Sequence, residues 1–294
     1  MQFPIVAAVD GSEGSLRALD WAASEAARSQ LPLRVVHASL WERYETAWPT
    51  FDTGRPAEQI LAEHLVASAQ ERVERLHAEV RTTADVRPED PVHALVHESH
   101  EAALLVLGSR GRGRIAGMLL GSVSLAVAGR SHCPVVVVPA AAPEIPPEPA
   151  RVVVGVGDAA GPSAAVRFAL AQAVSRHGEL IAVRAWRSPA HEAAKHPLLS
   201  GSPTSAHHQE AADHLEEVLA VLERSGPGAD IHRSVVQGPA HQVLIEAAEG
   251  ADLLVVGARR ADGHPGSRLG PVNHAVLHYA SCPVAVVPDT PAPQ

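Results

Sequence analysis

The sequence predicts an α/β protein built from two tandem, doubly wound domains. Three observations support this fold class. Apolar runs of strand length alternate with segments of helical periodicity along the whole chain. These runs are apolar throughout rather than alternating, which is typical of parallel strands covered by helices on both faces. The second half of the chain repeats the first, so the same fold is expected twice.

The repeat is visible in matching segments at matching distances. "ALLVLGSR" at 103–110 matches "DLLVVGAR" at 252–259, and "SHCPVVVVP" at 131–139 matches "ASCPVAVVP" at 280–288. An interval of 149 residues separates the members of three pairs, Gly108 and Gly257, Gly121 and Gly270, and Cys133 and Cys282. We therefore place the first domain at 1–140, a proline-rich linker at 141–150 and the second domain at 151–290.

Within the first half, strands and helices follow one another in a regular order. The helix after the first strand has Leu16, Leu19, Ala23 and Ala26 at helical spacing. Strands are predicted at 3–9, 33–38, 83–86, 103–107 and 134–138. Helices are predicted at 15–29, roughly 57–80, 91–100 and from 122 to 130.

Two loops of the first half follow predicted strands. Asp10, Gly11 and Ser12 come directly after the first strand, and a glycine-rich segment begins at Gly108 after the fourth. In open parallel sheets ligands bind beyond the carboxyl ends of the strands. The two loops are therefore expected to face one crevice.

The glycine-rich segment, "GSRGRGRIAGMLLGSVS" at 108–124, has the composition of a phosphate cradle. Its glycines permit close backbone approach, and the start of the following helix offers unpaired N–H groups. Arg110, Arg112 and Arg114 add positive charge. The alternative is a flexible crossing loop with solvated arginines. From the residues alone, we infer a phosphate-containing ligand.

Two other phosphate motifs do not fit this segment. The Lys-Ser/Thr of a Walker A loop is absent. A dinucleotide fingerprint forced onto Gly111, Gly113 and Ala116 would follow the fourth strand rather than the first, and it lacks the acidic residue expected about 20 positions later. Both interpretations are rejected.

At these residues the chain resembles the universal stress protein family in its tandem-domain form. Nucleotide-binding members carry G-x2-G-x9-G-[S/T] after the fourth strand, which Gly108, Gly111, Gly121 and Ser122 match, and "VDGS" at 9–12 matches the first loop. The resemblance implies a five-stranded parallel sheet per domain in the order 3-2-1-4-5. It also implies ATP as the ligand, with or without Mg²⁺. By position, the implied nucleotide-binding residues are Asp10, Gly11, Ser12, Ala38, Gly108, Ser109, Arg110, Gly111, Arg112, Gly113, Gly121, Ser122 and Val123.

The second copy of the loop departs from this pattern. Arg260 stands where Gly111 stands, Asp262 replaces Gly113, and Pro271 replaces Ser122, removing one hydroxyl and one N–H. We expect nucleotide binding in the first domain and weak or absent binding in the second. The weaker candidates are Asp158, whose spacing from its strand is altered, Ala185, Gly257, Gly270 and Val272.

Composition excludes several functions. A formal charge of −9 argues against broad nucleic-acid binding and gives no support for an anionic membrane surface. The N-terminus lacks a signal-like basic region, and no run of 18 apolar residues occurs, so a cytoplasmic protein is expected. Cys133 and Cys282 are expected to be buried structural thiols.

Catalytic and metal motifs are also missing. Two sets of histidines, His93, His97 and His100 and then His274 and His278, have helical spacing but no HExxH pattern, and exposed helix-face histidines are expected. No G-x-S-x-G elbow and no activated base stand out, so slow ATP hydrolysis at most is expected.

Three hypotheses about function remain. The leading one is an ATP-binding regulatory stress protein, the second a slow ATPase or phosphotransferase, and the third an interaction module that binds no nucleotide. An unknown protein partner is expected. The last apolar strand of each half should lie at a sheet edge, so the halves are expected to pack as a pseudo-twofold pair, with a homodimer as the assembly.

Overall fold

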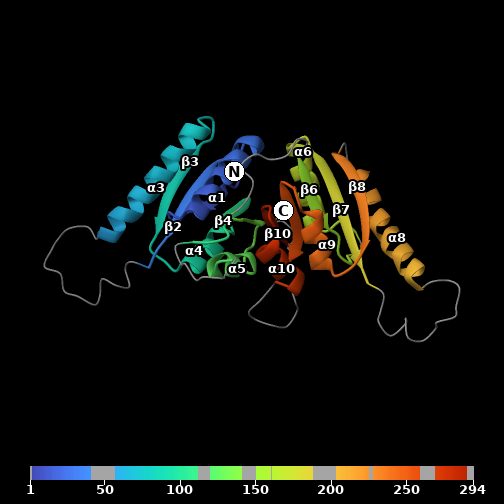
Figure 1. Ribbon diagram of the computed structural model, residues 1–294. Helices are drawn as coiled ribbons and strands as arrows, with labels where there is room; N and C mark the ends of the chain where they lie inside the picture. Colours follow the sequence, from blue (N-terminus) through green and yellow to red (C-terminus); the bar gives the residue numbers. More distant parts are fainter. Residues whose placement is uncertain are drawn as a thin grey trace. The chain divides into compact units, whose positions relative to one another are not determined.

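The computed structural model describes residues 2–40, 57–111, 120–140, 150–159, 161–187, 203–224, 228–258 and 269–289. These residues form two compact units, one from each half of the chain (Figure 1). Each unit is a parallel sheet with helices packed against it, which confirms the predicted fold class.

The sheet of the first unit has the order β3-β2-β1-β4-β5, and the four described pairings are parallel. Its strands are β1 (Ile5–Ala8), β2 (Leu33–Ala38), β3 (Thr82–Arg87), β4 (Leu104–Gly108) and β5 (Val135–Val138). Its helices are α1 (Glu13–Ser29), α3 (Ala57–Leu76), α4 (Pro91–Glu98) and α5 (Ser122–Ala128).

The second unit repeats this arrangement with the order β8-β7-β6-β9-β10, again with parallel pairings. Its strands are β6 (Arg151–Gly155), β7 (Glu179–Trp186), β8 (Asp230–Gln237), β9 (Leu253–Ala258) and β10 (Val284–Pro288). Its helices are α6 (Ala164–Ser175), α8 (Pro203–Glu223), α9 (Ala240–Ala247) and α10 (Pro271–Tyr279). Helix α8 runs along the β7–β8 side, as α3 runs along β2–β3 (Figure 1).

The central strands of the first unit are buried on both faces. Ile5, Val6 and Ala7 of β1 are at most 1% exposed, and the residues of β4 are all buried. This burial explains why the strands read as continuous apolar runs instead of alternating ones.

Local capping sets the start of α1 and α4. Ser12 is the N-cap of α1, and its Oγ accepts a hydrogen bond from the N–H of Ser15. Asp90 caps α4 by accepting from the N–H groups of Val92 and His93. A side-chain acceptor at the N-cap satisfies N–H groups that have no partner inside the helix.

Three helices end earlier than the sequence predicts, and for α5 the end is Ala128 rather than 130. Helix α3 ends at Leu76 rather than near 80, because β3 begins at Thr82, where it pairs with Leu33. The residues between them form a turn in which the Val80 N–H donates to the carbonyl of His77. Helix α4 ends at Glu98 rather than at 100, and the Ser99 Oγ donates back to the carbonyl of Val96.

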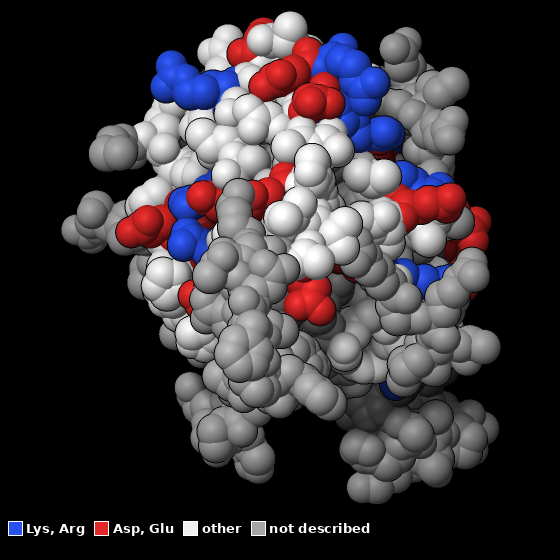
Figure 2. Space-filling model, turned by 90° about the vertical axis from the view of Figure 1, so that its left-hand side faces the viewer, with Lys and Arg blue, Asp and Glu red and all other residues white. Residues whose placement is uncertain are grey.

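Charged side chains on the surface of the first unit lie in pairs. Arg72 contacts Asp20, and Arg34 contacts Asp85, each at 2.6 Å. On the face in Figure 2, basic and acidic side chains are interspersed, without a broad basic patch among the described residues. None of the described helices combines the length and hydropathy that a bilayer-spanning segment needs.

Candidate functional site

The loop after β1 is a tight turn built on Asp10. Gly11 has a φ of +79°, in the left-handed region that glycine enters without strain. The Asp10 Oδ1 accepts from the N–H of Ser12 at 3.0 Å and from the Ser12 hydroxyl at 2.6 Å. This turn fixes the Asp10 carboxylate at the carboxyl end of the central strand.

Three glycines bring this turn against the loop that follows β4. A Cβ on Gly108 would lie 2.6 Å from the carbonyl carbon and oxygen of Gly14, and one on Gly14 would lie 2.7 Å from the carbonyl oxygen of Arg110. A Cβ on Gly111 would overlap the Asp10 Oδ2. At Gly14 and Gly108 a side chain is excluded because the nearest atoms belong to the backbone, whereas at Gly111 it would meet the end of the Asp10 side chain. The structure therefore brings the two predicted loops together.

Both ends of the glycine-rich loop are anchored. The Gly121 N–H donates to the carbonyl of Ser109 at 2.6 Å, and the Ser124 hydroxyl donates to the carbonyl of Gly108 at 2.7 Å. Ser109 is buried, and its N–H donates to Val138 of β5. These bonds tie Gly108 and Ser109 to the start of α5. Arg112, Gly113 and Arg114 lie outside the described residues.

The helix after the loop begins as the sequence predicts. Gly121 is the N-cap of α5 and has extended backbone, and Ser122 and Val123 form the first turn. N–H groups of a first helical turn have no intrahelical acceptor. These amides therefore lie next to the anchored end of the loop.

Ala38 is the last residue of β2, and a histidine beside it ties that strand to β1. The His37 ring is buried, and its Nδ1 donates to the carbonyl of Val9 at 2.7 Å. Ala38 itself is partly exposed. This bond holds the carboxyl ends of the two strands together.

The second unit builds the equivalent strand end differently. Asp158 comes three residues after the end of β6, whereas Asp10 comes two after β1. Its carboxylate accepts from the Arg184 guanidinium at 2.7 Å, and the same guanidinium donates to the carbonyl of Val156 at 3.1 Å. Arg184 thus occupies the role of His37, and it also binds the acid. Ala185 follows it in β7.

The loop after β9 is sterically open where its counterpart is closed. A Cβ on Gly257 would meet only the Ala165 Cβ, at an ordinary 3.7 Å, and one on Gly270 would meet nothing within 4 Å. The second domain nevertheless has an equivalent of the bond from Ser124 to Gly108, because the Asn273 side chain donates to the carbonyl of Gly257 at 2.9 Å. Pro271 begins α10 as expected of a first-turn proline.

Some predicted residues of the second loop can be placed and others cannot. Val272 lies in the first turn of α10 and is partly buried. Arg259, Arg260 and Asp262 lie outside the described residues.

Comparison with known proteins identifies the family. The profile described as "Universal stress protein family" matches residues 1–139 and again 149–288. The chain belongs to the universal stress protein family. It is 37% identical to a universal stress protein of Mycobacterium tuberculosis, over 97% of both chains.

A solved structure of a universal stress protein has the same fold. A universal stress protein from Archaeoglobus fulgidus matches 98% of both chains with a TM-score of 0.62 at 18% identity. A universal stress protein crystallised in complex with cAMP matches 47% of this chain and 98% of its own, at 31% identity and a TM-score of 0.35.

Three residues that shape the site of this universal stress protein were not predicted. Gly14, Ser124 and His37 make contacts or bonds that join the loops and strand ends of the first-domain site. Gly14 could have been found as the second glycine of "DGSEG", and Ser124 as the polar residue three positions after Gly121. No local signal distinguishes His37 from an ordinary polar residue at a strand end.

The cysteines of both domains are buried and unpaired, as predicted. Burial raises the pKa of the Cys133 thiol to about 11 and that of Cys282 to about 12. The thiolate is the reactive form, so these residues are inert in the folded protein.

The predicted histidine sets remain on helix surfaces or just beyond them. His93, His97 and His274 are exposed, and His100 is exposed after α4 has ended. His278 differs from the predicted exposed position, because its side chain is partly buried. This burial, together with the nearby His274, lowers the pKa of His278. Within the described ranges, no three potential metal ligands form a group.

Proposed function

We propose that this universal stress protein is an ATP-binding regulatory protein whose nucleotide site is the crevice of the first domain. The observation that carries the proposal is steric. The glycines at 14 and 108 pack against backbone atoms and admit no side chain, whereas those at 257 and 270 do. This close packing would hold the backbone N–H groups of the two loops together at the carboxyl ends of β1 and β4, where phosphate groups bind in open parallel sheets.

The residues of the first crevice suit the parts of a nucleotide. The loop from Gly108 and the first turn after Gly121 would supply backbone donors to the phosphates. The carboxylate of Asp10 would accept from hydroxyl groups of the ribose. The backbone of Ala38 would contact the base. When bound, ATP would supply a charged group that orders the loop and changes an exposed surface.

The second domain is proposed to bind nucleotide weakly or not at all. Its loop has lost one N–H and one hydroxyl at Pro271, and Asp158 is engaged by Arg184. Each lost charge-assisted hydrogen bond costs roughly 1.5–3 kcal/mol, which is on the order of ten- to a hundredfold in affinity.

The test is to count nucleotide per chain. Gently purified protein is denatured, and the released nucleotide is identified by chromatography. One ATP per chain supports the proposal. Two per chain would contradict the asymmetry, and no nucleotide, with no binding when ATP is added back, would favour the interaction module.

A matched pair of variants locates the site. Gly111→Ala would displace the terminal oxygen of Asp10, a movable side chain, so we expect the fold to survive and ATP affinity to fall at least tenfold. Gly270→Ala meets open space and should leave the affinity unchanged. Equal losses in the two variants would reject the first-domain crevice.

Slow ATP hydrolysis remains the alternative activity. Turnover well above background that is lost in Asp10→Ala would support an enzyme, whereas tight binding with only background turnover would support the regulatory role. The homodimer also stays a prediction, and light scattering of the full chain measures it.

A further inference from the structure

Helix α10 of the second domain carries two histidines one helical turn apart. His274 and His278 are at positions i and i+4, which places them on the same face of the helix. Their ring centroids lie 4.6 Å apart, and the two ring planes are inclined by 30°. His274 is exposed and His278 is partly buried, so an ion in solution can reach the pair.

The separation of the two rings matches that of two imidazoles bound to one metal ion. A zinc–nitrogen bond of about 2.1 Å places the centre of an imidazole ring roughly 3.2 Å from the ion. Two such bonds at an angle of about 90–110° separate the ring centroids by roughly 4.5–5.2 Å. The observed 4.6 Å lies in this range. The backbone of α10 therefore already holds the two rings at a chelating distance.

The other contacts between histidine rings of the described residues do not have this separation. His100 and His132 of the first domain are stacked with their centroids 3.8 Å apart, which is too close for two bonds to one ion. His97 and His100 are 6.3 Å apart, so their bonds to a shared ion would have to point in nearly opposite directions. The geometry therefore singles out the pair on α10.

Two properties of this helix end favour a bound cation. His278 lies in the last turn of α10, where the helix dipole stabilises positive charge. Burial and the neighbouring His274 lower the pKa of His278, so its ring is neutral at pH 7. The neutral ring is the form of histidine that binds metal ions.

The first domain lacks this pair. At the 149-residue interval that relates the two halves, Leu125 and Gly129 stand in the places of His274 and His278. Helix α5 nevertheless forms there. The fold therefore does not require a histidine at either position, and the pair is a property of the second domain.

We propose that His274 and His278 bind one first-row transition-metal dication, with water in its remaining coordination positions. Imidazole nitrogen suits Zn²⁺, Ni²⁺ and Cu²⁺, whereas Mg²⁺ and Ca²⁺ prefer oxygen ligands. Within the described residues no third ligand joins the pair. The site is therefore open and exchangeable, unlike a closed structural zinc site with four protein ligands. The proposal does not depend on nucleotide binding in the first domain.

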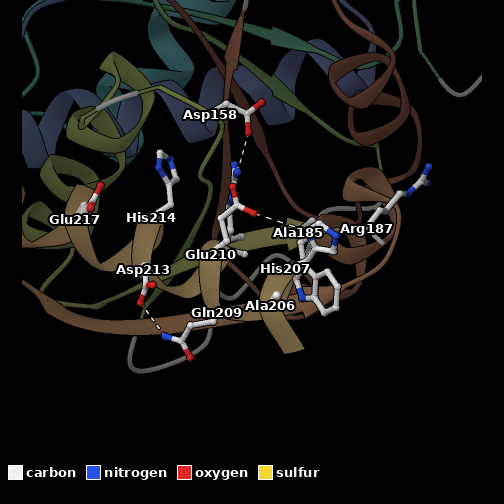
Figure 3. A pocket seen from close by; sticks show the side chains of 13 residues that line it. Asp158, Ala185, Arg187, Ala206, His207, Gln209, Glu210, Asp213, His214 and Glu217 are labelled. Atoms are coloured by element: carbon white, nitrogen blue, oxygen red, sulfur yellow. Dashed lines mark hydrogen bonds and ion pairs between the residues drawn. The ribbon is translucent and has the colours of Figure 1, made fainter. Parts of the chain in front are cut away.

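Carboxylates of the same domain are competitors for a cation. Glu210 and Glu217 of α8 line a pocket at the carboxyl ends of β6 and β7 (Figure 3). Carboxylate oxygens suit Mg²⁺ and Ca²⁺ better than imidazole does. Ions of the two preferences therefore distinguish the histidine pair from the acidic face of α8.

The test is calorimetric titration of the full, nucleotide-free chain at pH 7.5 with Zn²⁺, Cu²⁺ and Mg²⁺. We expect the tightest site to take one Zn²⁺ or Cu²⁺ per chain, with Cu²⁺ bound more tightly than Zn²⁺. An excess of Mg²⁺ should not displace either ion. His274→Gln and His278→Gln should each weaken this site at least tenfold, because even the loss of a residue that only orients a metal ligand costs about 10–100-fold.

Two control variants keep the histidine pair of α10. His93→Gln with His97→Gln removes another pair at i and i+4, and Glu210→Gln with Glu217→Gln removes pocket carboxylates. Neither should change the tightest site. A control that weakens it as much as His274→Gln does, or displacement by Mg²⁺, would overturn the proposal. Half an ion per chain with a doubled mass in light scattering would also overturn it, because two copies would then share the ion.

Discussion

Replacing Gly108 with alanine would place a methyl group 2.6 Å from the carbonyl carbon and oxygen of Gly14. An ordinary contact needs 3.4 Å or more, so β4 and the start of α1 would have to separate by about 0.8 Å. Both partners are backbone and cannot rotate away. Overpacking of this kind costs about 1–3 kcal/mol, and we expect the upper half of that range.

The assay is thermal unfolding of the full chain by calorimetry, in which the two domains can unfold separately. A loss of about 2–3 kcal/mol lowers the Tm of a domain of this size by roughly 5–10 °C. Gly257→Ala is the matched control, because its Cβ would make an ordinary 3.7 Å contact with Ala165. At a compatible backbone conformation, the change from glycine to alanine stabilises by about 0.4–1 kcal/mol.

Two results would refute the steric reasoning. One is an unchanged Tm in Gly108→Ala, which would mean that α1 and β4 adjust without cost. The other is an equal loss in Gly257→Ala, which would mean that any side chain after the fourth strand is harmful, whatever its surroundings.

Three further predictions follow from the described contacts. Because burial raises the thiol pKa values to about 11 for Cys133 and about 12 for Cys282, both should resist iodoacetamide at pH 8 until the protein unfolds. Rapid labelling of the native protein would contradict the burial of the thiols. The free energy of unfolding should also fall as the pH rises from 9.0 through these pKa values, because the unfolded chain then loses thiol protons that the folded protein keeps. Asp20→Asn removes a bidentate ion pair with Arg72, whose two N–O distances are 2.6 and 2.7 Å and whose side chains are about one-third exposed. The free energy of unfolding in urea should fall by about 1 kcal/mol. An unchanged value would show that the ion pair does not stabilise the fold. NMR titration should find the pKa of His278 below 6.5, so its contribution to stability is lost as the pH falls, and a value at or above 6.5 would argue against its burial.

The sequence predicted the architecture well because the signals for it are local. The apolar run at 33–38 is the observed β2, and the glycines at 108, 111 and 121 already marked a tight backbone approach. Continuous apolar strands implied a sheet covered on both faces, and burial of β1 and β4 confirms it.

The contacts that distinguish the two crevices were not predictable in this way. His37 reaches back to Val9, and Arg184 to Val156 and Asp158, so each bond joins segments 26–28 residues apart in the chain. Such pairings depend on which strand ends are neighbours in the sheet. Periodicity alone also overestimated the length of α3, because the need to reverse direction before β3 is a tertiary constraint.

The paired anchors at Gly108–Ser124 and Gly257–Asn273 have a consequence for engineering. In both domains, a side chain three residues after the second loop glycine donates a hydrogen bond to the carbonyl of the glycine that precedes the loop. Ser124 bonds Gly108 in the first domain, and Asn273 bonds Gly257 in the second. The intervening segments, 109–120 and 258–269, have equal length. The two segments therefore have the same length between equivalent attachment points. A chimera that carries residues 109–120 in place of 258–269 would separate what the loop contributes to ligand binding from what the surrounding residues of the domain contribute.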